Sequence, residues 1–379
     1  MTTALNNVRV LDLSRQLPGP FCSMMLGDLG ADVLTIAAPN DAMGVGLPML
    51  GRNKRHMTLN LKRDEGREIL ERLVADADVL LEGFRPGVTA KLGVDYVRLS
   101  QRNPRLIYCS ISGYGQDGPY RNKVGHDINY LGYAGVLGVM GAAGGPPVIP
   151  GVQIADIGGG ALMAVIGILA ALVARRHTGQ GQFVDIAMLD GAVAWNLFHI
   201  LLHQIGQATT RGSTQLTGRY PCYAVYEARD GKYLSVGALE PHFWRHLCEH
   251  FGQAAFIPLQ FAEGEDGERV FGFFRSTFLT KTRDEWVREL EAVDICLGPV
   301  NDIAEALEDP QLLARSMIRE EEHPQYGTLR TVGCPIKLSD TPPVVGRAPY
   351  GFGEHTNEVL RELGYDAAAV GELRAAGVV

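Results

Sequence analysis

Val8-Arg9-Val10-Leu11-Asp12-Leu13 mixes apolar and polar side chains in near alternation and predicts a β-strand close to the start of the chain. The turn Pro18-Gly19-Pro20 follows, and its second proline suits the first position of a helix that we expect to end at Gly30. A second strand is predicted at Asp32-Val33-Leu34-Thr35-Ile36. Strand, helix and strand in this order are typical of a parallel sheet with right-handed crossovers.

The same alternation continues through the first part of the chain. Further strands are predicted at 57–61, 79–83 and 106–112, with a helix at 63–76. We therefore predict an α/β fold with a large, doubly wound domain. The loop after the first strand lacks G-x-G-x-x-G and the chain has no Walker loop, so nothing indicates a nicotinamide or flavin cofactor.

A second kind of pattern begins after a polar, turn-rich segment. Tyr223–Ala228 and Lys232–Ala238 flank Arg229-Asp230-Gly231 and predict a β-hairpin, with helices after it. The predicted division is a large domain begun by residues 1–200, a linker at 201–222, a small α+β domain at 223–325 and a return segment, 326–379, that completes the large domain.

Composition limits the classes of function. With 46% hydrophobic and 21% charged residues, the 379-residue chain is typical of a soluble protein with two domains. A net charge of -8 disfavours binding to nucleic acid. The six cysteines are scattered and no signal peptide is evident, so we expect reduced thiols and a cytoplasmic protein.

One apolar stretch raises the question of a membrane. Residues 157–174 carry no charge, which is borderline for a membrane span. The glycine-rich start and the strand pattern that soon follows favour a buried helix, closed by Arg175, Arg176, His177 and Gly179. We therefore expect no membrane partner.

Two motifs could carry chemistry. His126 precedes Asp127 in Gly125-His126-Asp127-Ile128-Asn129-Tyr130, and Asp156 precedes three glycines in Ala155-Asp156-Ile157-Gly158-Gly159-Gly160. If the motifs meet, an imidazole and a carboxylate could together move a proton on and off a carbon atom beside a carbonyl. The helix dipole should keep Asp156 ionised, and the glycines should let a ligand approach the backbone. The alternative is that Asp156 only caps a helix and His126 is an ordinary polar residue.

Other polar residues give weaker signals. Glu240, just past the hairpin, could orient His126 if it reached it, although such a carboxylate is usually solvated. His242, His246 and His250 share a helix face, but no H-E-x-x-H accompanies them and we expect no metal site. Arg52-Asn53-Lys54-Arg55 could hold a phosphate or form a solvated charged face.

Taken together, these motifs resemble CoA-transferase family III, also called the CaiB/BaiF family, and most of all its racemase branch, which acts on α-methylacyl-CoA. The similarity spans nearly the whole chain. Its matching stretches are Gly19–Val33, Gly51–Arg55, Leu59–Lys62, Glu82–Val88, Ser112–Gly115, Gly125–Tyr130, Asp156–Gly160, Val236–Pro241 and Gly353–Thr356.

The resemblance implies a Rossmann-like large domain, a smaller α+β domain and an interlocked homodimer whose site lies between the large domain of one subunit and the small domain of the other. It implies that His126 and Asp156 are the two bases, that Glu240 supports His126, and that CoA enters as part of the substrate with no other cofactor. Residues with an implied CoA contact are Leu59, Asn60, Leu61, Lys62, Gly83, Phe84, Arg85, Lys91, Gly125, Asp127, Ile128, Asn129 and Tyr130.

The implied function is a cofactor-independent racemase or epimerase of 2-methyl-branched acyl-CoA thioesters that transfers a proton through an enolate. Two alternatives stay open. In a class III CoA-transferase, Asp156 would attack the thioester and carry the acyl group; Gly151–Asp156 resembles such transferases as much as the racemase. An inactive acyl-CoA-binding protein is the other, because Ala37-Ala38 replaces the usual CoA-contacting arginine of the family.

Overall fold

The computed structural model describes residues 2–41, 48–323 and 326–379. The chain forms two compact units. The first comprises Met1–Ala134, Pro150–Trp195 and Pro310–Val379, and the second comprises Gly135–Ile149 and Asn196–Asp309. The second unit thus includes the stretch expected to be a linker, 201–222. The first unit includes 310–325, which was expected to belong to the small domain. The division into domains stays a prediction.

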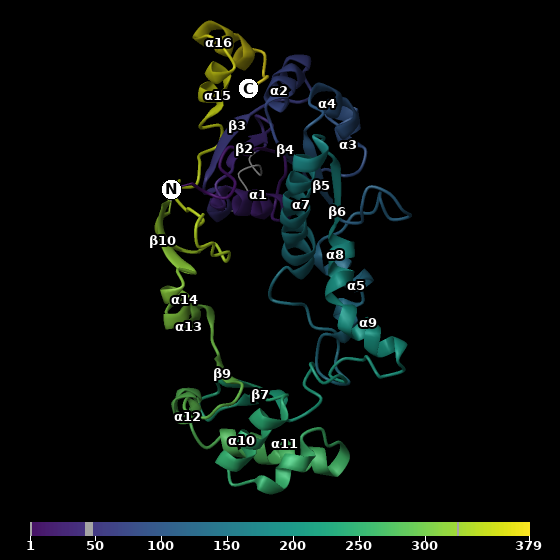
Figure 1. Ribbon diagram of the computed structural model, residues 1–379, viewed down its shortest axis with the longest axis vertical. Helices are drawn as coiled ribbons and strands as arrows, with labels where there is room; N and C mark the ends of the chain where they lie inside the picture. The colour runs from purple at the N-terminus through teal and green to yellow at the C-terminus, as the bar shows by residue number, and fades with distance from the viewer. Residues whose placement is uncertain (1, 42–47, 324–325) are drawn as a thin grey trace. The chain divides into compact units, whose positions relative to one another are not determined.

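The first unit is built on a six-stranded parallel sheet (Figure 1). The strand order is β3-β2-β1-β4-β5-β6, the order of a doubly wound Rossmann-like sheet. The predicted α/β fold class is therefore confirmed. The strands are β1 (Arg9–Asp12), β2 (Asp32–Ala37), β3 (Lys54–Thr58), β4 (Val79–Glu82), β5 (Ile107–Ser112) and β6 (Phe183–Ala187).

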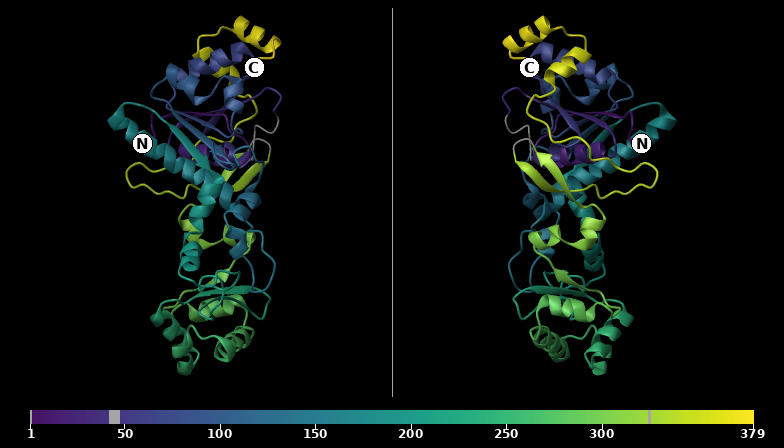
Figure 2. Two further views of the ribbon diagram at one scale, coloured as in Figure 1. Left: turned by 90° about the vertical axis from the view of Figure 1, so that its right-hand side faces the viewer. Right: turned by 90° about the vertical axis from the view of Figure 1, so that its left-hand side faces the viewer.

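Helices cover both faces of this sheet. Alternate side chains such as Leu11 and Leu34 face the core shared with α2, α4 and α15. The opposite face carries α1 and α7, and Figure 2 shows α7 as the long teal helix beside the sheet. The helices that cover the two faces are α1 (Pro18–Asp28), α2 (Asp64–Ala75), α4 (Tyr96–Arg102), α7 (Met163–Thr178) and α15 (Thr356–Glu362). The unit also contains α3 (Val88–Leu92), α5 (Asp127–Tyr133), α8 (Met188–Trp195), α14 (Pro310–Ala314), α16 (Ala367–Ala375) and a 3₁₀ turn at Pro48–Gly51.

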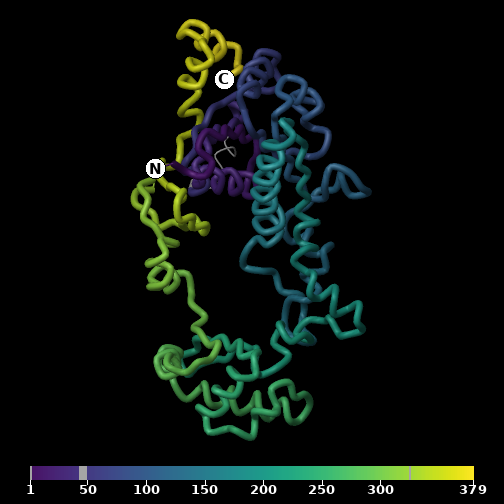
Figure 3. The backbone as a smooth tube through the Cα atoms, viewed as in Figure 1, coloured from purple at the N-terminus to yellow at the C-terminus, as the bar shows by residue number. Residues whose placement is uncertain are grey.

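The C-terminal residues return to the sheet formed by the N-terminal ones. Figure 3 shows the yellow C-terminal trace beside the purple and blue strands. The Thr58 N–H donates to Thr356 Oγ1 at 3.0 Å, and the Asn60 N–H donates to the Val378 carbonyl at 2.7 Å. A short antiparallel pair that the sequence did not predict, β10 (Ile318–His323) and β11 (Gly327–Val332), precedes this return. The boundary predicted between residues 325 and 326 falls between its two strands.

The long apolar helix differs from its prediction in two ways. Its first part, Ile154–Leu162, is π-helical, and α7 continues it to the expected left-handed Gly179. Among the residues that the structure describes, Ile154–Thr178 alone is long and apolar enough to cross a membrane, and its most apolar window is 39% buried. Ile166 and Val173 are 58% and 57% exposed, so only part of the helix is buried as expected. The absence of a membrane partner stays a prediction.

The second unit packs helices on a three-stranded antiparallel sheet. The predicted hairpin is present as β7 (Tyr223–Glu227) and β8 (Tyr233–Gly237), and β9 (Leu297–Val300) pairs with β8. Its buried core is rich in rings, among them Trp244, Phe274 and Trp286. The helices are α6 (Val136–Val139), α9 (Leu197–Gln204), α10 (Pro241–His250), α11 (Gly264–Phe278), α12 (Arg283–Leu290) and α13 (Ile303–Leu307), with a 3₁₀ segment at Ala254–Leu259.

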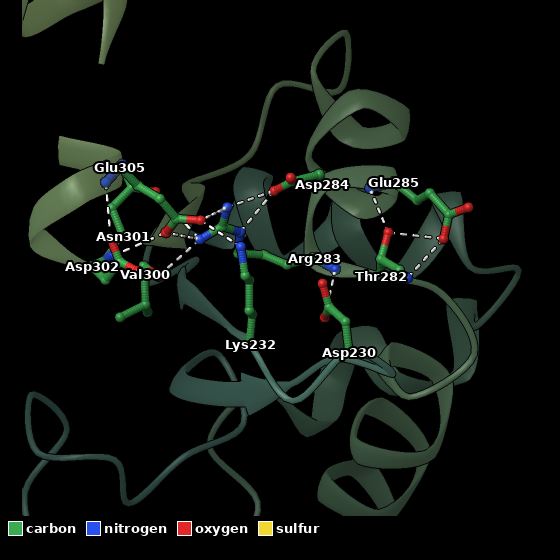
Figure 4. Close-up of polar contacts among 10 residues, drawn as sticks. All are labelled: Asp230, Lys232, Thr282, Arg283, Asp284, Glu285, Val300, Asn301, Asp302 and Glu305. Carbon is green, nitrogen blue, oxygen red and sulfur yellow. Dashed lines mark hydrogen bonds and ion pairs between the residues drawn. The ribbon is translucent and has the colours of Figure 1, made fainter. Parts of the chain in front are cut away.

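Arg283 ties α12 to α13 in this unit (Figure 4). Its guanidinium donates to both carboxylate oxygens of Glu305, at 2.7 and 2.9 Å, and to the Val300 carbonyl at 3.1 Å. Lys232, which directly precedes β8, also pairs with Glu305 at 2.5 Å. A planar guanidinium fits a carboxylate in this two-pronged way, so the contact fixes the orientation of both helices.

Candidate active site

The first candidate base stands at the start of α5. His126 is the N-cap residue, and its backbone N–H donates to Asn129 Oδ1 at 3.0 Å. The imidazole is exposed. The local structure therefore fixes the backbone at His126 and leaves the ring accessible to a ligand.

Asp127 joins the two motifs that the sequence predicted to meet. Its Oδ1 accepts hydrogen bonds from the Ala155 N–H at 2.7 Å and the Asp156 N–H at 2.9 Å. These donors belong to the first turn of the π-helix Ile154–Leu162, where backbone N–H groups lack partners within the helix. Single π-helical turns in longer helices are frequent at functional sites. Asp127, which directly follows His126, thus contacts the turn that carries Asp156.

Asp156 is the second candidate base. Burial and the nearby Asp127 carboxylate raise its pKa to about 6, while the His126 imidazole acts in the opposite direction. His126 and Asp156 are therefore close enough to interact electrostatically. Desolvation and a like charge raise this pKa, but a value of about 6 leaves the carboxylate mostly ionised at neutral pH, so the expected ionisation of Asp156 is not contradicted. Asp156 is not the cap of its helix: Gln153 holds that position.

The glycines after Asp156 serve helix packing. A Cβ on Gly159 would lie 2.7 Å from the Met188 carbonyl oxygen, and a Cβ on Gly160 would lie 2.8 Å from Met188 Cγ. Gly191, on α8, meets Gly159 in the same close approach. These glycines thus let α8 lie against the π-helix, whereas the sequence suggested that they let a ligand approach.

The loop after β4 belongs to the same neighbourhood. Burial raises the pKa of Tyr130 to about 12, with Asp156 adding to the rise and Arg85 opposing it. Arg85 is therefore within electrostatic range of Tyr130. Glu82, at the end of β4, accepts a hydrogen bond from the Phe84 N–H at 2.6 Å, and burial raises its pKa to about 7. Glu82 was not among the candidate residues predicted from the sequence; its signal was a carboxylate that closes an otherwise apolar strand.

The residues with an implied CoA contact differ in exposure. Leu59 and Leu61 are buried in the core, so any contact from them would come from the backbone. Asn60 is half-buried, and its side chain donates to the Gly377 carbonyl at 3.0 Å. Phe84 and Asp127 are half-buried, as is Gly125, and Tyr130 is buried. Those with exposed side chains or backbone are Lys62, Gly83, Arg85, Lys91, Ile128 and Asn129.

The basic cluster at 52–55 does not form a solvated face. Arg52 is buried and pairs with Asp28 at 2.7 Å. Lys54 is buried 3.8 Å from Asp12. Arg55 pairs with Asp32 at 3.0 Å and also with acidic residues of α15. These cations hold the sheet to its helices, so the proposed phosphate contact from them is not supported.

Glu240 belongs to the second unit, where it is the exposed N-cap residue of α10. It lies near Cys296, whose pKa is raised by burial and by the Glu240 charge. Its support of His126 stays a prediction. Along α10, His246 Nδ1 lies 2.8 Å from the Asp294 carbonyl oxygen and His250 Nε2 lies 3.4 Å from Glu289. In the described part of the chain, no group of three or more His, Cys, Asp or Glu residues could hold a metal ion.

Comparison with known proteins identifies the family. The model of CoA-transferase family III matches residues 5–356. The chain belongs to CoA-transferase family III. Alpha-methylacyl-CoA racemase of Mus musculus is 39% identical over 99% of this chain and 97% of its own length. Succinyl-CoA:glutarate CoA-transferase of Homo sapiens is 32% identical over 99% of this chain and 90% of its own length.

A solved structure supports the same placement. A CaiB/BaiF family protein from Brucella suis has a TM-score of 0.82 and 29% identity, covering 96% of this chain and 100% of that one. The predicted family is thus confirmed. CoA-transferase family III contains racemases and transferases that are both similar to this chain, so membership is consistent with an acyl-CoA substrate and leaves two reactions to distinguish.

Proposed function

We propose that the protein is a racemase or epimerase of 2-methyl-branched acyl-CoA thioesters that works by two-base proton transfer. The observation that carries the proposal is the Asp156 carboxyl, whose pKa is raised to about 6 beside His126. Imidazole is the side chain that ordinarily changes charge near neutral pH. A carboxyl group with a pKa close to that range can exchange roles with it, and a reversible racemisation requires such an exchange.

The proposed steps move one proton on each face of the substrate. One base removes the proton from the carbon atom beside the thioester carbonyl, and the bonding electrons pass to the carbonyl oxygen as an enolate. The conjugate acid of the other base donates its proton to the opposite face, and the carbonyl re-forms. Both bases exchange protonation states in each turnover, so the reverse reaction starts from the product complex.

The remaining parts of the proposal follow the family resemblance. CoA enters as part of the substrate, and because only a proton moves, the reaction requires no redox group. Exposed Lys62, Arg85 and Lys91 are the cations proposed to contact CoA. We propose an interlocked homodimer, which the mass of the protein in solution would test, and retain Glu240 as the support of His126.

A CoA-transferase is the second candidate. Its support is the similarity to succinyl-CoA:glutarate CoA-transferase together with the partly exposed carboxylate of Asp156. In this reaction Asp156 would attack the thioester carbonyl, the C–S bond would break, and the acyl group would remain as a mixed anhydride while CoA leaves. The CoA thiolate would then attack the Asp156 carbonyl, which releases the donor acid and leaves Asp156 as a CoA thioester. The acceptor carboxylate would displace CoA from that thioester to form a second anhydride, and attack of CoA on the acceptor carbonyl would give the new thioester and free Asp156.

One experiment separates the two candidates. The protein is incubated in heavy water with one enantiomer of a 2-methylacyl-CoA and no acceptor acid. A racemase incorporates deuterium beside the carbonyl while optical rotation decays. Exchange of CoA only after an acceptor acid is added, with acyl-enzyme trapped by hydroxylamine, would overturn the proposal in favour of the transferase.

Matched histidine variants locate the activity. His126→Gln should slow the exchange by about 10²–10⁴-fold because one base is lost. His177→Gln removes an exposed imidazole at the end of α7 in the same unit and should leave the rate unchanged. Equal rates in the two variants would exclude His126 as a base.

A further inference from the structure

The loop before α5 is held to that helix by a cluster of four tyrosines: Tyr114, Tyr120, Tyr130 and Tyr133. Tyr114 is its centre. The Tyr114 ring lies 5.9 Å from Tyr120, 5.2 Å from Tyr130 and 5.8 Å from Tyr133, edge to face in each case. Edge-to-face ring pairs attract one another beyond the effect of the area that they bury. The loop and the helix therefore behave as one packed element.

Lys123 closes the outer side of this tyrosine cluster. Its ammonium lies 3.8 Å from the centre of the Tyr120 ring and 4.9 Å from that of Tyr133. It also donates a hydrogen bond to the Tyr133 hydroxyl at 2.9 Å. The positive charge is attracted to the faces of both rings, so Lys123 stabilises the cluster from its outer side.

On the inner side of the tyrosine cluster, Tyr130 contacts the residue that precedes the candidate base His126. Its hydroxyl donates to the Gly125 carbonyl at 2.6 Å, one residue before His126. The ring is wedged between two backbone segments: a Cβ on Gly113 would lie 2.6 Å from the Tyr130 hydroxyl, and a Cβ on Gly125 would lie 2.8 Å from Tyr130 Cε1. Both glycines are thus needed for this close approach.

The His126 ring itself is exposed, so packing around it does not determine where it lies. Its place depends on the backbone that carries it. Both polar groups of the Gly125–His126 peptide are held: the His126 N–H donates to Asn129 Oδ1, and the Gly125 carbonyl accepts from the Tyr130 hydroxyl.

We propose that Tyr130 is a positioning residue for the proton transfer: held by Tyr114, it fixes the Gly125–His126 peptide so that the imidazole faces the same substrate atom as Asp156. This inference rests on the proposed function. Burial raises the pKa of Tyr130 to about 12, so the hydroxyl stays protonated as a donor even at alkaline pH. Because the hydroxyl is committed to Gly125 and the ring is buried, positioning replaces the CoA contact that the family resemblance implied for this side chain.

The test uses Tyr130→Phe, which removes one oxygen atom and keeps the ring. We expect kcat for exchange of the α-proton to fall about tenfold, because small displacements of a catalytic group reduce rates steeply. KM for the thioester should stay within about twofold, since the lost bond is internal to the protein. A raised KM with unchanged kcat would identify Tyr130 as a CoA contact and overturn the proposal, as would no change in either constant.

The second unit offers a matched control. The Tyr226 hydroxyl also donates to a carbonyl five residues earlier, that of Pro221 at 2.7 Å, and the ring is buried. Tyr226→Phe should lower the denaturant midpoint of unfolding by about as much as Tyr130→Phe does, with kcat unchanged. Equal falls of kcat in both variants would show a general loss of folded protein and overturn the proposal.

A second variant guards against misfolding at the buried site. Lys123→Met opens the tyrosine cluster from its exposed side and should lower kcat about two- to threefold without raising KM. A kcat equal to that of the unaltered protein would contradict the role of the cluster.

A spectroscopic measurement separates this inference from the proposed function. In protein labelled with ¹³C-histidine, the His126 ring signal is assigned by its loss in His126→Gln. It should shift or broaden in Tyr130→Phe and stay unchanged in Tyr226→Phe, whichever reaction the protein catalyses. An unchanged His126 signal in Tyr130→Phe overturns the positioning role, whereas absence of α-deuteration by the unaltered protein overturns only the racemase.

Discussion

The first unit buries two ion pairs beside its parallel sheet, whereas the second fills its core with rings and leaves its main ion network partly in water. Arg52 and Asp28 are 2% and 0% exposed, and Lys54 and Asp12 are both 0% exposed. Arg283, in contrast, pairs with Glu305, which is 25% exposed. The units therefore depend on charge to different degrees.

The difference is instructive because a buried ion pair is a poor source of stability. Removing two charges from water costs about as much as their attraction returns. In the first unit, Asp12 also accepts hydrogen bonds from Ser14 and Ser23, and Lys54 Nζ donates to the Pro20 carbonyl at 2.8 Å. These contacts fix where α1 begins against β1 and β3, so we interpret the buried charges as devices for positioning the sheet edge. The second unit is held mainly by packing.

The largest expected effect is chemical and concerns Asp156. Asp156→Asn should slow exchange of the α-proton by about 10²–10⁴-fold, because it removes a base and keeps its size. Stability should stay equal or rise. Since the folded pKa of about 6 lies above the ordinary 3.8, the ionised carboxylate opposes folding above that pH, and the amide removes this cost. Exchange rates and thermal unfolding measure the two effects; a rate within tenfold of the unaltered protein contradicts the assignment.

The next largest effect is the loss of stability when a buried cation is removed from each unit. Lys54→Met should lower the free energy of unfolding by about 3–5 kcal/mol, because Asp12 would be left buried without its cation. Arg283→Met should cost about 1–2 kcal/mol, since Glu305 can turn to water. Denaturant unfolding of both variants provides the measurement. Equal losses of stability would contradict the inference that the two units depend on charge to different degrees.

The pH dependence of the reaction gives a smaller effect. For the enantiomer whose proton Asp156 removes, the rate should fall about tenfold per pH unit below pH 6, as the carboxylate becomes protonated. A pH profile of deuterium incorporation tests this. A rate that stays constant from pH 5 to pH 8 would show that no group with this pKa takes part.

The smallest effect is the pH dependence of stability in the first unit. Burial lowers the pKa of Lys54 from 10.5 to about 8, an effect that the Asp12 charge opposes. Between these pH values the unfolded chain keeps a proton that the folded chain releases, so the stability contributed by this group rises from pH 8 to pH 10.5. Unfolding of the protein and of Lys54→Met at several pH values should show the rise only in the former. Parallel curves would contradict it.

The sequence predicted the sheet well because its signal is local. Alternating strands such as Arg9–Asp12 and the prolines at the start of α1 mark elements that neighbouring residues determine. The bounds were less accurate: α1 begins at Pro18 instead of Pro20, and the strand predicted at 57–61 spans Lys54–Thr58. The hairpin β7–β8 was found through Asp230-Gly231 for the same reason. The pair β10–β11 was missed, because its charged residues, Arg319 to Glu322, give no apolar pattern.

The candidate site stays a prediction, and the structure adds one contact to it. His126 and Asp156 were singled out by residue type, but their connection through Asp127 depends on contacts between residues 28 and 29 positions apart, which no local pattern reveals. The upward shift of the Asp156 pKa to about 6 was not predicted, because it depends on burial and on the nearby Asp127 carboxylate. The basic run at 52–55 looked solvated because the acidic partners, Asp12 and Asp28, lie far from it in the sequence.

Two bases on opposite faces of the substrate leave a signature in the earliest products of the reaction. One enantiomer of a 2-methylacyl-CoA is followed in heavy water over the first few per cent of conversion. With two bases, deuterium appears in the product of inverted configuration while the remaining substrate still carries protium. Deuterium that enters the substrate with its configuration retained, as fast as it enters the product, would show that a single base acts on one face.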